Sequence, residues 1–576
     1  MNDLFKKNYG DNMKRLRLYV GLPAIAGTLI AGCGGNGDLE VGQNPGMKPA
    51  VLRCSELSTK DLNLPGLVLD SAESMVARTG DAKSGYPAHC YLKGRINART
   101  GIDGKPYAIG FDLRLPDQTW NGKFFYSGDA GLGGALSSLE AVAKAESGDY
   151  ANALQLGYAF ASSDSGHQSS GPMPIFEGGF GVDPQARLDY GYNALGTWAP
   201  LAKKVVTKFY GSGPERSYYV GCSKGGQTGM QAAARYADEF DGILAGNPGF
   251  NLPKAGAAAM HDNQQLAKVN PDITKAFSQK TLNLISSRIL ARCDALDGAA
   301  DGIVNDVAGC KVAFNFERDV PQCSAGTTND EECLTAAQKV AFSAIMGGAK
   351  TTTGNSLYAD FPWDPGITSS GWVGWKTSAN VSLSPTAMAN VFSSPPTLGV
   401  GPFLPTANTY WRAYDLDRTN EFIFGTSGIY SVSAMDFMLP PGLDTLVRLK
   451  QRSKLIVYHG AADGIFSVND TINWYKKLQA NDPAAGDYAK LFVVPGMGHC
   501  SGGPATDRFD AFTALVKWVE QDTPPTKIVA ATTPGNKEIP ATWSASRTRP
   551  LCAFPQKAVL RKGATDLESA DSFACE

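Results

Sequence analysis

The chain has 576 residues, of which 43% are hydrophobic and 19% charged, and its net charge is −2. This composition is that of a globular protein with a sizeable core, and the length favours roughly two to four domains. The near-zero net charge excludes the strong bias that nucleic-acid binding or attraction to an acidic surface requires, so we expect no nucleic acid partner.

The N-terminus has the pattern of a bacterial export signal. Basic residues follow Met13, and the apolar run 18–30 after them is too short to span a bilayer comfortably. Small residues then lead to Cys33, as in a lipobox, where the cysteine is lipidated and becomes the mature N-terminus. Cleavage nearby as an ordinary secretory signal is the alternative.

We therefore expect residues 1–32 to be a signal peptide of the lipoprotein type. Residues 33–50 are rich in Gly and Asn and are expected to form a flexible tether. The protein is expected to be exported and either lipid-anchored to the bacterial outer membrane, its only contact with a membrane, or free in the periplasm or outside the cell.

From about residue 105 the chain alternates strand-like and helix-like stretches, which predicts an α/β fold with a parallel sheet covered by helices on both faces. The expected strands are 107–115, 123–126, 158–161, 217–220, 242–245, 455–458 and 491–494. The expected helices are 188–210, 227–236, 471–478 and 511–519.

This alternation breaks in the middle of the chain, where scattered helices are mixed with many Gly, Ser, Pro and Thr residues. A segment inserted between two halves of one sheet is the simplest interpretation. The expected division is a first core part, 51–249, an inserted segment, 250–442, and a second core part, 443–576.

Cysteine usage agrees with export. Of the eleven cysteines ten remain when Cys33 is set aside, and an even number in an oxidising compartment predicts disulfides. The sequence does not prove their connectivity. Our hypothesis is the set Cys54–Cys90, Cys222–Cys500, Cys293–Cys310, Cys323–Cys333 and Cys552–Cys575.

Two of these cysteines adjoin residues that hydrolases use, in the dipeptides Cys222-Ser223 and His499-Cys500. If Ser223 is a nucleophile and His499 its base, their side chains must come within about 3 Å of each other. Cys222 and Cys500 then lie within the span of a disulfide. The catalytic pair and the disulfide therefore support each other.

Ser223 stands in Gly221-Cys222-Ser223-Lys224-Gly225, a G-x-S-x-G pattern with an expected strand before it and an expected helix after it. This is the context of a nucleophile elbow, in which glycines flank the serine because the turn leaves no room for Cβ atoms. An ordinary glycine turn is the alternative, since a chain rich in Gly and Ser matches the pattern by chance.

The chain has only five histidines, so few residues are candidates for the general base. His499 lies in a loop directly after the expected strand 491–494, where the base of an α/β-hydrolase belongs. His459 also ends a strand, but it has no partner cysteine and is interpreted as structural.

The orienting acid should lie between Ser223 and His499 in chain order. Asp463 does, and its carboxylate would fix the imidazole tautomer and stabilise the imidazolium. Asp470 competes for this role, but it directly precedes the expected helix 471–478, where an N-cap role is favoured.

The oxyanion requires backbone N–H donors. One is expected from Lys224, the residue after the nucleophile. The second is expected from Gly131, in the glycine-rich stretch after the strand 123–126, where a turn that merely packs is the alternative.

With these residues in place, the chain resembles the tannase and feruloyl esterase family, whose hallmark is a Cys-Ser and a His-Cys dipeptide joined by a disulfide, with an Asp between them. Stretches 99–104, 183–189, 495–503 and 547–552 are also similar to family sequence. The resemblance runs from about residue 50 to the end and is weakest in 350–440. It implies an α/β-hydrolase core with a large inserted lid domain, and a carboxylic ester hydrolase.

The resemblance also implies a structural calcium ion in the lid, in the loop Cys293–Ile303. The implied ligands are the side chains of Asp294, Asp297 and Asp301 and the carbonyl oxygens of Ala299 and Ile303. Oxygen-only ligands suit a hard cation, although the spacing is not that of an EF-hand. An acidic surface loop closed by the disulfide is the alternative.

Lid aromatics Trp372, Trp375 and Phe392, and Phe466 just after the acid, are candidates to stack on an aromatic acyl group, with core packing as the alternative for each. Two departures from the family matter. Lys224 stands where members often carry Thr or Glu, so a cation is expected to border the site. A member that hydrolyses terephthalate monoesters clamps the substrate carboxylate with an Arg, and the best-matching position here is Met388.

The sequence therefore predicts an exported serine carboxylesterase that hydrolyses aromatic or phenolic acid esters, of the feruloyl esterase or tannase type, through an acyl-enzyme. The expected partner is a small aromatic ester, with no organic cofactor, and the protein is expected to be a monomer. Hydrolysis of mono(2-hydroxyethyl) terephthalate or related synthetic aromatic esters is the first alternative. The second is a non-catalytic surface binding protein on a hydrolase scaffold.

Overall fold

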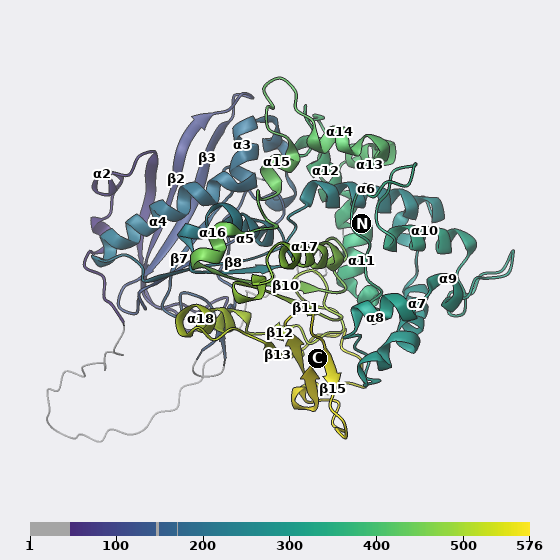
Figure 1. Cartoon of the computed structure of the whole chain (residues 1–576). Coiled ribbons are helices and arrows are strands. Elements are labelled where there is room, and N and C mark those ends of the chain that lie inside the picture. The colour runs from purple at the N-terminus through teal and green to yellow at the C-terminus, as the bar shows by residue number, and fades with distance from the viewer. Residues whose placement is uncertain (1–46, 146–148, 170) are drawn as a thin grey trace, which may run out of the picture. The chain divides into compact units, whose positions relative to one another are not determined.

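The computed structural model describes residues 47–145, 149–169 and 171–576 (Figure 1). The expected signal peptide, Cys33 and the tether up to residue 46 lie outside these residues. The last part of the expected tether is instead attached to the folded chain. The Lys48 N–H donates to Trp120 O at 2.8 Å, and the Ala50 N–H donates to Asp117 O at 2.9 Å.

The large sheet has nine strands. In spatial order they are β1 (Leu67–Met75), β2 (His89–Thr100), β3 (Pro106–Pro116), β7 (Ala159–Ser163), β4 (Lys123–Ser127), β8 (Arg216–Cys222), β9 (Gly242–Gly246), β10 (Lys454–Gly460) and β11 (Ala489–Val494). The strands from β7 to β11 pair in parallel, whereas β1, β2, β3 and β7 pair antiparallel.

The expected α/β class is thus confirmed, but the expected parallel pairing holds only from β7 to β11. Strands β1, β2 and β3 follow one another through short connections without a crossover helix, and short connections produce antiparallel pairs. The chain before residue 105 therefore contributes two strands that helix–strand alternation did not indicate.

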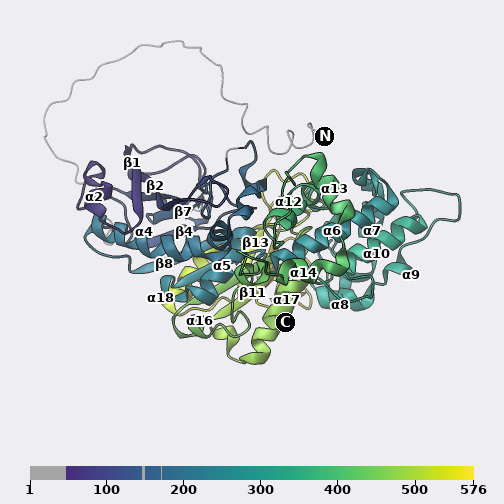
Figure 2. The ribbon, with the colours of Figure 1, turned by 90° about the horizontal axis from the view of Figure 1, so that it is seen from above.

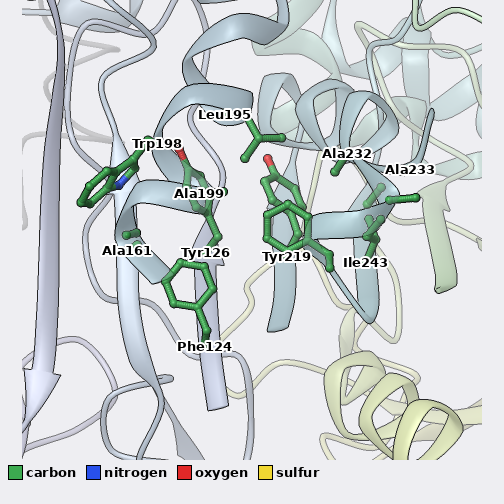
Figure 3. Packing of buried hydrophobic residues seen from close by; sticks show 14 of the residues in the cluster. Phe124, Tyr126, Ala161, Leu195, Trp198, Ala199, Tyr219, Ala232, Ala233 and Ile243 are labelled. Carbon is green, nitrogen blue, oxygen red and sulfur yellow. The ribbon is translucent and has the colours of Figure 1, made fainter. Parts of the chain in front are cut away.

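Helices cover both faces of the sheet because successive strand residues point to opposite sides. Phe124 and Tyr126 of β4 belong to a hydrophobic cluster that also contains residues of helices α4 (Ala194–Tyr210), α5 (Lys224–Arg235), α16 (Val447–Arg452) and α17 (Val468–Asn481). Figure 3 shows the part of this cluster around α4 and α5. Phe125 faces the other way and packs with α18 (Ala511–Gln521). The helix expected over 188–210 is divided into α3 (Pro184–Leu188), a π-helical turn, Asp189–Asn193, and α4.

The chain leaves the sheet after β9 and returns at β10, although these strands are hydrogen-bonded neighbours. The insert between them is helical. Its helices are α6 (Leu252–Val269), α7 (Gln279–Cys293), α8 (Val307–Ala313), α9 (Phe316–Asp319), α10 (Ala336–Met346), α11 (Ser370–Thr377), α12 (Leu383–Asn390), α13 (Pro405–Ala413), α14 (Thr419–Phe424) and α15 (Ala434–Met438). They gather beside one end of the sheet in both views (Figures 1 and 2).

Insert and core belong to a single compact unit, Gly46–Glu576. One hydrophobic cluster shows why, because it joins Phe180 and Tyr190 of the core to Met388, Phe392 and Phe437 of the insert. Among the helices of the described residues, none is long and apolar enough to cross a membrane.

Shorter elements complete the fold. They are α2 (Thr59–Leu62), the ribbon β5 (Ala143–Lys144) and β6 (Tyr150–Ala151), the sheet β12 (Arg508–Phe509), β13 (Lys527–Ala531) and β14 (Thr548–Cys552), and the pair β15 (Ala558–Leu560) and β16 (Phe573–Cys575).

The structure forms the five disulfides of the sequence hypothesis, which is thereby confirmed. They are Cys54–Cys90, Cys222–Cys500, Cys293–Cys310, Cys323–Cys333 and Cys552–Cys575.

Candidate active site

A sharp turn carries Ser223 between the end of β8 and the start of α5. Its backbone has φ +65° and ψ −119°, a conformation that non-glycine residues rarely adopt and that occurs at functional turns. The Ser223 N–H donates to Gly246 O at 3.0 Å. A Cβ atom on Gly221 would lie 2.6 Å from Gly225 O, so the turn excludes a side chain there, as the elbow pattern requires.

Three side chains meet at the carboxyl edge of the parallel strands. Asp463 follows β10 and His499 follows β11, the strand paired with β10. The Nε2 atom of His499 lies 2.8 Å from Ser223 Oγ, and its Nδ1 atom lies 2.8 Å from Asp463 Oδ2. This chain of contacts has the geometry that lets an imidazole take a proton from a hydroxyl while a carboxylate fixes its tautomer.

Asp463 is buried, and its carboxylate is well supplied with donors. Oδ1 accepts the N–H groups of Ile465 and Phe466, and Oδ2 accepts Asn247 Nδ2 at 2.7 Å as well as His499. Burial alone would raise the pKa of Asp463, but His499, His459 and their hydrogen bonds outweigh it and hold the pKa well below its usual range. The carboxylate therefore stays ionised.

Asn247 was not identified from the sequence. It follows β9 directly, as Asp463 and His499 follow their own strands, and the carboxyl ends of adjacent parallel strands share one edge of the sheet. A polar residue directly after an expected central strand was therefore the available signal.

His459 is completely buried and has structural partners. Its Nδ1 atom lies 2.9 Å from Thr471 Oγ1 and its Nε2 atom 3.0 Å from Phe466 O, which fixes the turn after Asp463. The N-cap of α17 is Ser467, so the N-cap role expected for Asp470 is wrong. The helix begins earlier than expected, and Asp470 lies in its first turn and accepts Asn251 Nδ2.

The Cys222–Cys500 disulfide joins the two loops of this site. Each cysteine adjoins one member of the Ser223–His499 contact, and the two Cα atoms are 6.1 Å apart. Cys500 itself has φ +67°, a strained conformation for a residue with a side chain. One covalent bond thus limits how far the serine and the histidine can separate.

The glycine-rich stretch after β4 packs against the start of α5. A Cβ atom on Gly225 would lie 2.8 Å from Asp129 O, so the two backbones are in direct contact. Gly131 has φ +54°, and its carbonyl oxygen accepts the Tyr190 hydroxyl at 3.0 Å. The assignment of Lys224 and Gly131 as oxyanion donors stays a prediction.

The Lys224 side chain does not border the site as a cation, so that expectation is wrong. The side chain is 2% exposed, and its Nζ atom lies 3.3 Å from Asp129 Oδ2. It turns inward because a buried carboxylate and a hydroxyl receive it there, the latter being Thr228 Oγ1 at 2.7 Å.

Of the four expected substrate-binding aromatics, two contact His499. The ring centre of Trp375, on α11 of the insert, lies 4.9 Å from the centre of the His499 imidazole. The ring centre of Phe466 lies 5.3 Å from it. Trp372 and Phe466 are 5% and 4% exposed and share one hydrophobic cluster, and Phe392 is completely buried in another. Of these three, Phe466 is the one whose ring contacts His499. For Trp372 and Phe392 the structure favours the packing alternative.

The expected calcium loop forms, but its carboxylates bond to protein groups. Asp294 Oδ1 accepts the N–H groups of Asp301 and Gly302, Asp297 Oδ2 accepts Asn305 Nδ2, and Asp301 pairs with Arg549. The Ala299 and Ile303 N–H groups donate to Asp297 and Asp301. In the described part of the chain, no three His, Cys, Asp or Glu side chains form a group that could hold a metal ion. The oxygen-only donor chemistry suits calcium, and the calcium site stays a prediction.

Comparison with known proteins settles the family. The family model described as tannase and feruloyl esterase matches residues 95–576. The chain belongs to this family. It is accordingly a carboxylic ester hydrolase.

Among curated relatives, the mono(2-hydroxyethyl) terephthalate hydrolase of Piscinibacter sakaiensis is 39% identical over 525 residues, which is 85% of each chain. Feruloyl esterase C of Talaromyces stipitatus is 23% identical and covers 88% of this chain and 91% of its own. Among solved structures, feruloyl esterase B from Aspergillus oryzae has a TM-score of 0.69 at 20% identity, covering 91% of this chain and 99% of that chain. These likenesses confirm the α/β-hydrolase fold.

Proposed function

We propose that this esterase hydrolyses esters of aromatic or phenolic acids through an acyl-enzyme on Ser223. The observation that supports this most directly is the unbroken contact from Ser223 through His499 to the buried Asp463. The five disulfides are typical of an exported protein and accord with a substrate outside the cytoplasm.

In the first half-reaction His499 Nε2 takes the proton from Ser223 Oγ as that oxygen attacks the ester carbonyl. Asp463 stabilises the imidazolium that forms. The backbone N–H groups of Lys224 and Gly131 hold the oxyanion of the tetrahedral intermediate. His499 then gives its proton to the alkoxide that leaves, and the acyl group stays on Ser223.

In the second half-reaction water attacks the acyl carbonyl, with His499 as base, and the acid is released as Ser223 recovers its proton. Tautomer control matters in both halves, because Nε2 must be free of its proton when each attack begins. The Asp463 carboxylate accepts a hydrogen bond from Nδ1, which holds the imidazole proton on Nδ1 and leaves Nε2 free.

The acyl pocket is proposed to lie between Trp375 and Phe466, whose rings flank His499 edge-on. Aromatic walls suit an aromatic acyl group because offset and edge-to-face ring pairs are favourable. Two lysines nearby in the sequence are not available to bind a second carboxylate, since Lys224 pairs with Asp129 and Lys376 pairs with Asp262. A neutral phenolic acid ester is therefore favoured over an ester that carries a free carboxylate.

Hydrolysis of terephthalate monoesters is the second candidate, and the 39% identical relative named for that activity favours it. Against it, Met388 is completely buried in the insert, at the position expected to correspond to a carboxylate-binding Arg. A non-catalytic binding role is the remaining alternative, but it would not require a hydrogen-bonded Ser, His and Asp at one strand edge.

The proposal includes a structural calcium ion at the loop Cys293–Ile303, supported by oxygen-only donors and the family resemblance. In the structure Asp301 pairs with Arg549. Calcium added to chelator-treated protein should raise Tm, and Asp297→Asn should abolish that rise. An unchanged Tm together with metal-free protein on elemental analysis would remove calcium from the account.

Lipid attachment at Cys33 and monomeric state are also part of the proposal. Intact mass of protein purified from membranes should show a diacyl or triacyl addition at Cys33, and an unmodified N-terminus further along would contradict it. Light scattering should give the mass of one chain.

The test of function is product release from ethyl ferulate, methyl gallate, mono(2-hydroxyethyl) terephthalate and p-nitrophenyl acetate, followed by chromatography. Turnover of ethyl ferulate or methyl gallate, absent in Ser223→Ala, supports the proposal. Preference for the terephthalate ester would select the second candidate. Full activity in Ser223→Ala, or no hydrolysis of any ester by the wild type, would contradict the mechanism.

A further inference from the structure

An ion pair is buried directly behind the turn that carries Ser223. Lys224 Nζ lies 3.3 Å from Asp129 Oδ2, and the two side chains are 2% and 4% exposed. Burial lowers the pKa of the Lys224 ammonium, and the Asp129 carboxylate opposes that shift. Neither side chain takes part in the proposed proton transfers, so the pair needs another explanation.

The pair is the centre of a small polar network. Thr228 Oγ1 accepts from Lys224 Nζ at 2.7 Å and donates to Asp129 Oδ1 at 3.2 Å. Ser165, in the loop after β7, donates its hydroxyl to Asp129 Oδ2. The Lys224 ammonium also lies 4.5 Å from the ring centre of Tyr190. Three separate segments are therefore joined: the first turn of α5, the glycine-rich stretch after β4, and the loop after β7.

The same segments carry the two expected oxyanion donors. Lys224 supplies one through its backbone, and Gly131 is two residues from Asp129 in the glycine-rich stretch. The Tyr190 hydroxyl holds the Gly131 carbonyl oxygen at 3.0 Å, while its ring faces the Lys224 ammonium. A shift of the pair would change the distance between the two donors.

We propose that the Lys224–Asp129 pair positions the oxyanion hole by fixing the glycine-rich stretch against the start of α5. In this proposal the side-chain pair does not contact the substrate. It fixes the positions of the two backbone segments that carry the N–H donors. This inference rests on the proposed function, since it assigns a task to residues behind the same site.

The contact between the glycine-rich stretch and α5 depends on the two opposite charges and not on packing alone. Removing one partner leaves the other buried and unpaired, which is strongly unfavourable, whereas replacing both by neutral groups removes that penalty. The network offers no second charge to a lone ammonium or carboxylate, because the other members named here are the hydroxyl groups of Thr228 and Ser165, the Tyr190 ring, and the Gln227 amide oxygen, 3.4 Å from Thr228 Oγ1. Single neutral substitutions should therefore disturb the loop more than the double substitution does.

The experiment compares Lys224→Met, Asp129→Asn and the double variant with the wild type. The probe is p-nitrophenyl acetate, and rates are expressed per active site titrated with a fluorophosphonate. Each single variant should lose about 10²-fold in kcat, the size of one missing oxyanion donor, with little change in KM. The double variant should recover to about tenfold below the wild type, since it has no unpaired charge.

Lys339→Met is the matched control. Lys339 is also buried, in α10 of the insert, where its Nζ donates to the carbonyl oxygens of Glu317 and Val320 at 2.9 Å. Helix α10 lies away from α5 in both views (Figures 1 and 2). This variant should have a lower Tm and the wild-type kcat per titrated site.

Wild-type kcat in the single variants, with only Tm lowered, would overturn the inference and leave the proposed function standing, provided that Ser223→Ala is inactive. If the single variants do not fold, the double variant decides. A kcat equal to that of the wild type would show that the pair positions nothing. A wild type without activity towards any ester would overturn both proposals.

Discussion

The catalytic edge of the sheet and the helical insert are held in place by different means. Ser223, Asp463 and His499 follow strands β8, β10 and β11 of one parallel run, and the Cys222–Cys500 disulfide closes the arrangement covalently. The insert packs on the core through a shared hydrophobic cluster, and it joins this edge through additional polar contacts. The Glu538 carboxylate, for example, accepts the N–H of Ser370 at the start of α11 at 2.5 Å. It also accepts the N–H of Gly503, four residues after His499, at 2.8 Å.

Asp364 makes a similar connection. It lies in the insert, is buried, and accepts the N–H of Gly496 at 3.0 Å in the turn that leads to His499. The comparison indicates that the sheet edge with Ser223, Asp463 and His499 performs the chemistry. The part of the insert that faces this edge, here called the wall and including Trp375, contacts the substrate. Substitutions at the edge should therefore lower kcat, whereas substitutions in the wall should mainly raise KM.

The largest effect is expected for Asp463→Asn. An amide at this position can stabilise the wrong imidazole tautomer, so kcat should fall about 10⁴-fold with an unchanged fold and little change in KM. Asp470→Asn is the control, because Asp470 contacts Asn251 rather than His499, and it should keep most of the activity. Steady-state kinetics on both variants would contradict the account if their losses were similar.

The next effect concerns the disulfide at the edge. Replacing Cys222 and Cys500 by serine should destabilise the protein by about 3–5 kcal/mol, since the closed loop is long. It should also lower kcat, because the serine and histidine loops can then separate. The control replaces Cys323 and Cys333, which close a loop of sequence separation 10 within the insert.

That control should cost less stability and leave kcat unchanged. Thermal melts and kinetics on both double variants make the comparison. Equal kcat in the two variants would show that the Cys222–Cys500 bond stabilises the fold without positioning the site.

A smaller effect is expected for the wall. Trp375→Ala should raise KM for an aromatic ester about tenfold with a modest change in kcat, through loss of roughly 1–2 kcal/mol of ring contact. Trp372→Ala is the matched control, because Trp372 is buried among Phe342 and other packing residues. It should lower Tm more than it changes KM. A larger KM effect in Trp372→Ala would reverse the assignment.

The smallest effect is a pH dependence at Asp364. Burial raises the pKa of Asp364 to about 6, although the N–H groups of Gly496 and Gly366 partly oppose this. The unfolded value is about 3.9, so the folded state binds more protons between these values. The stability from this group is complete below about pH 4 and is lost as the pH rises through about 6.

Asp364→Asn removes this titration. The Tm advantage of the wild type over the variant should therefore shrink by roughly 2–4 °C between about pH 4 and pH 7. Thermal melts of both proteins across this range provide the measurement. A constant difference would mean that the carboxyl does not titrate there.

Prediction from sequence succeeded where a short pattern fixes local geometry. The elbow around Ser223 and the histidine after β11 stand next to recognisable strands, and the neighbouring cysteines added a second, independent constraint. The main sheet was only partly predicted, because β1 and β2 pair as consecutive antiparallel strands and leave no helix–strand alternation in the sequence.

Side-chain direction was the harder problem. Lys224 was expected to face the site, but its direction is set by Asp129, which lies far away in the sequence. Trp372 and Trp375 are three residues apart on one short helix, yet one packs inside the insert and the other contacts His499. Such differences depend on which distant segments cover each face of a helix, and no local pattern records that.

The measurement that tests the central claim most directly is covalent labelling by a fluorophosphonate, followed by intact mass and peptide mapping. The account predicts one adduct per chain, on Ser223, with loss of ester hydrolysis in proportion to labelling, and no adduct in Ser223→Ala. An adduct on another residue, or full hydrolytic activity in labelled protein, would contradict the assignment of Ser223 as the nucleophile.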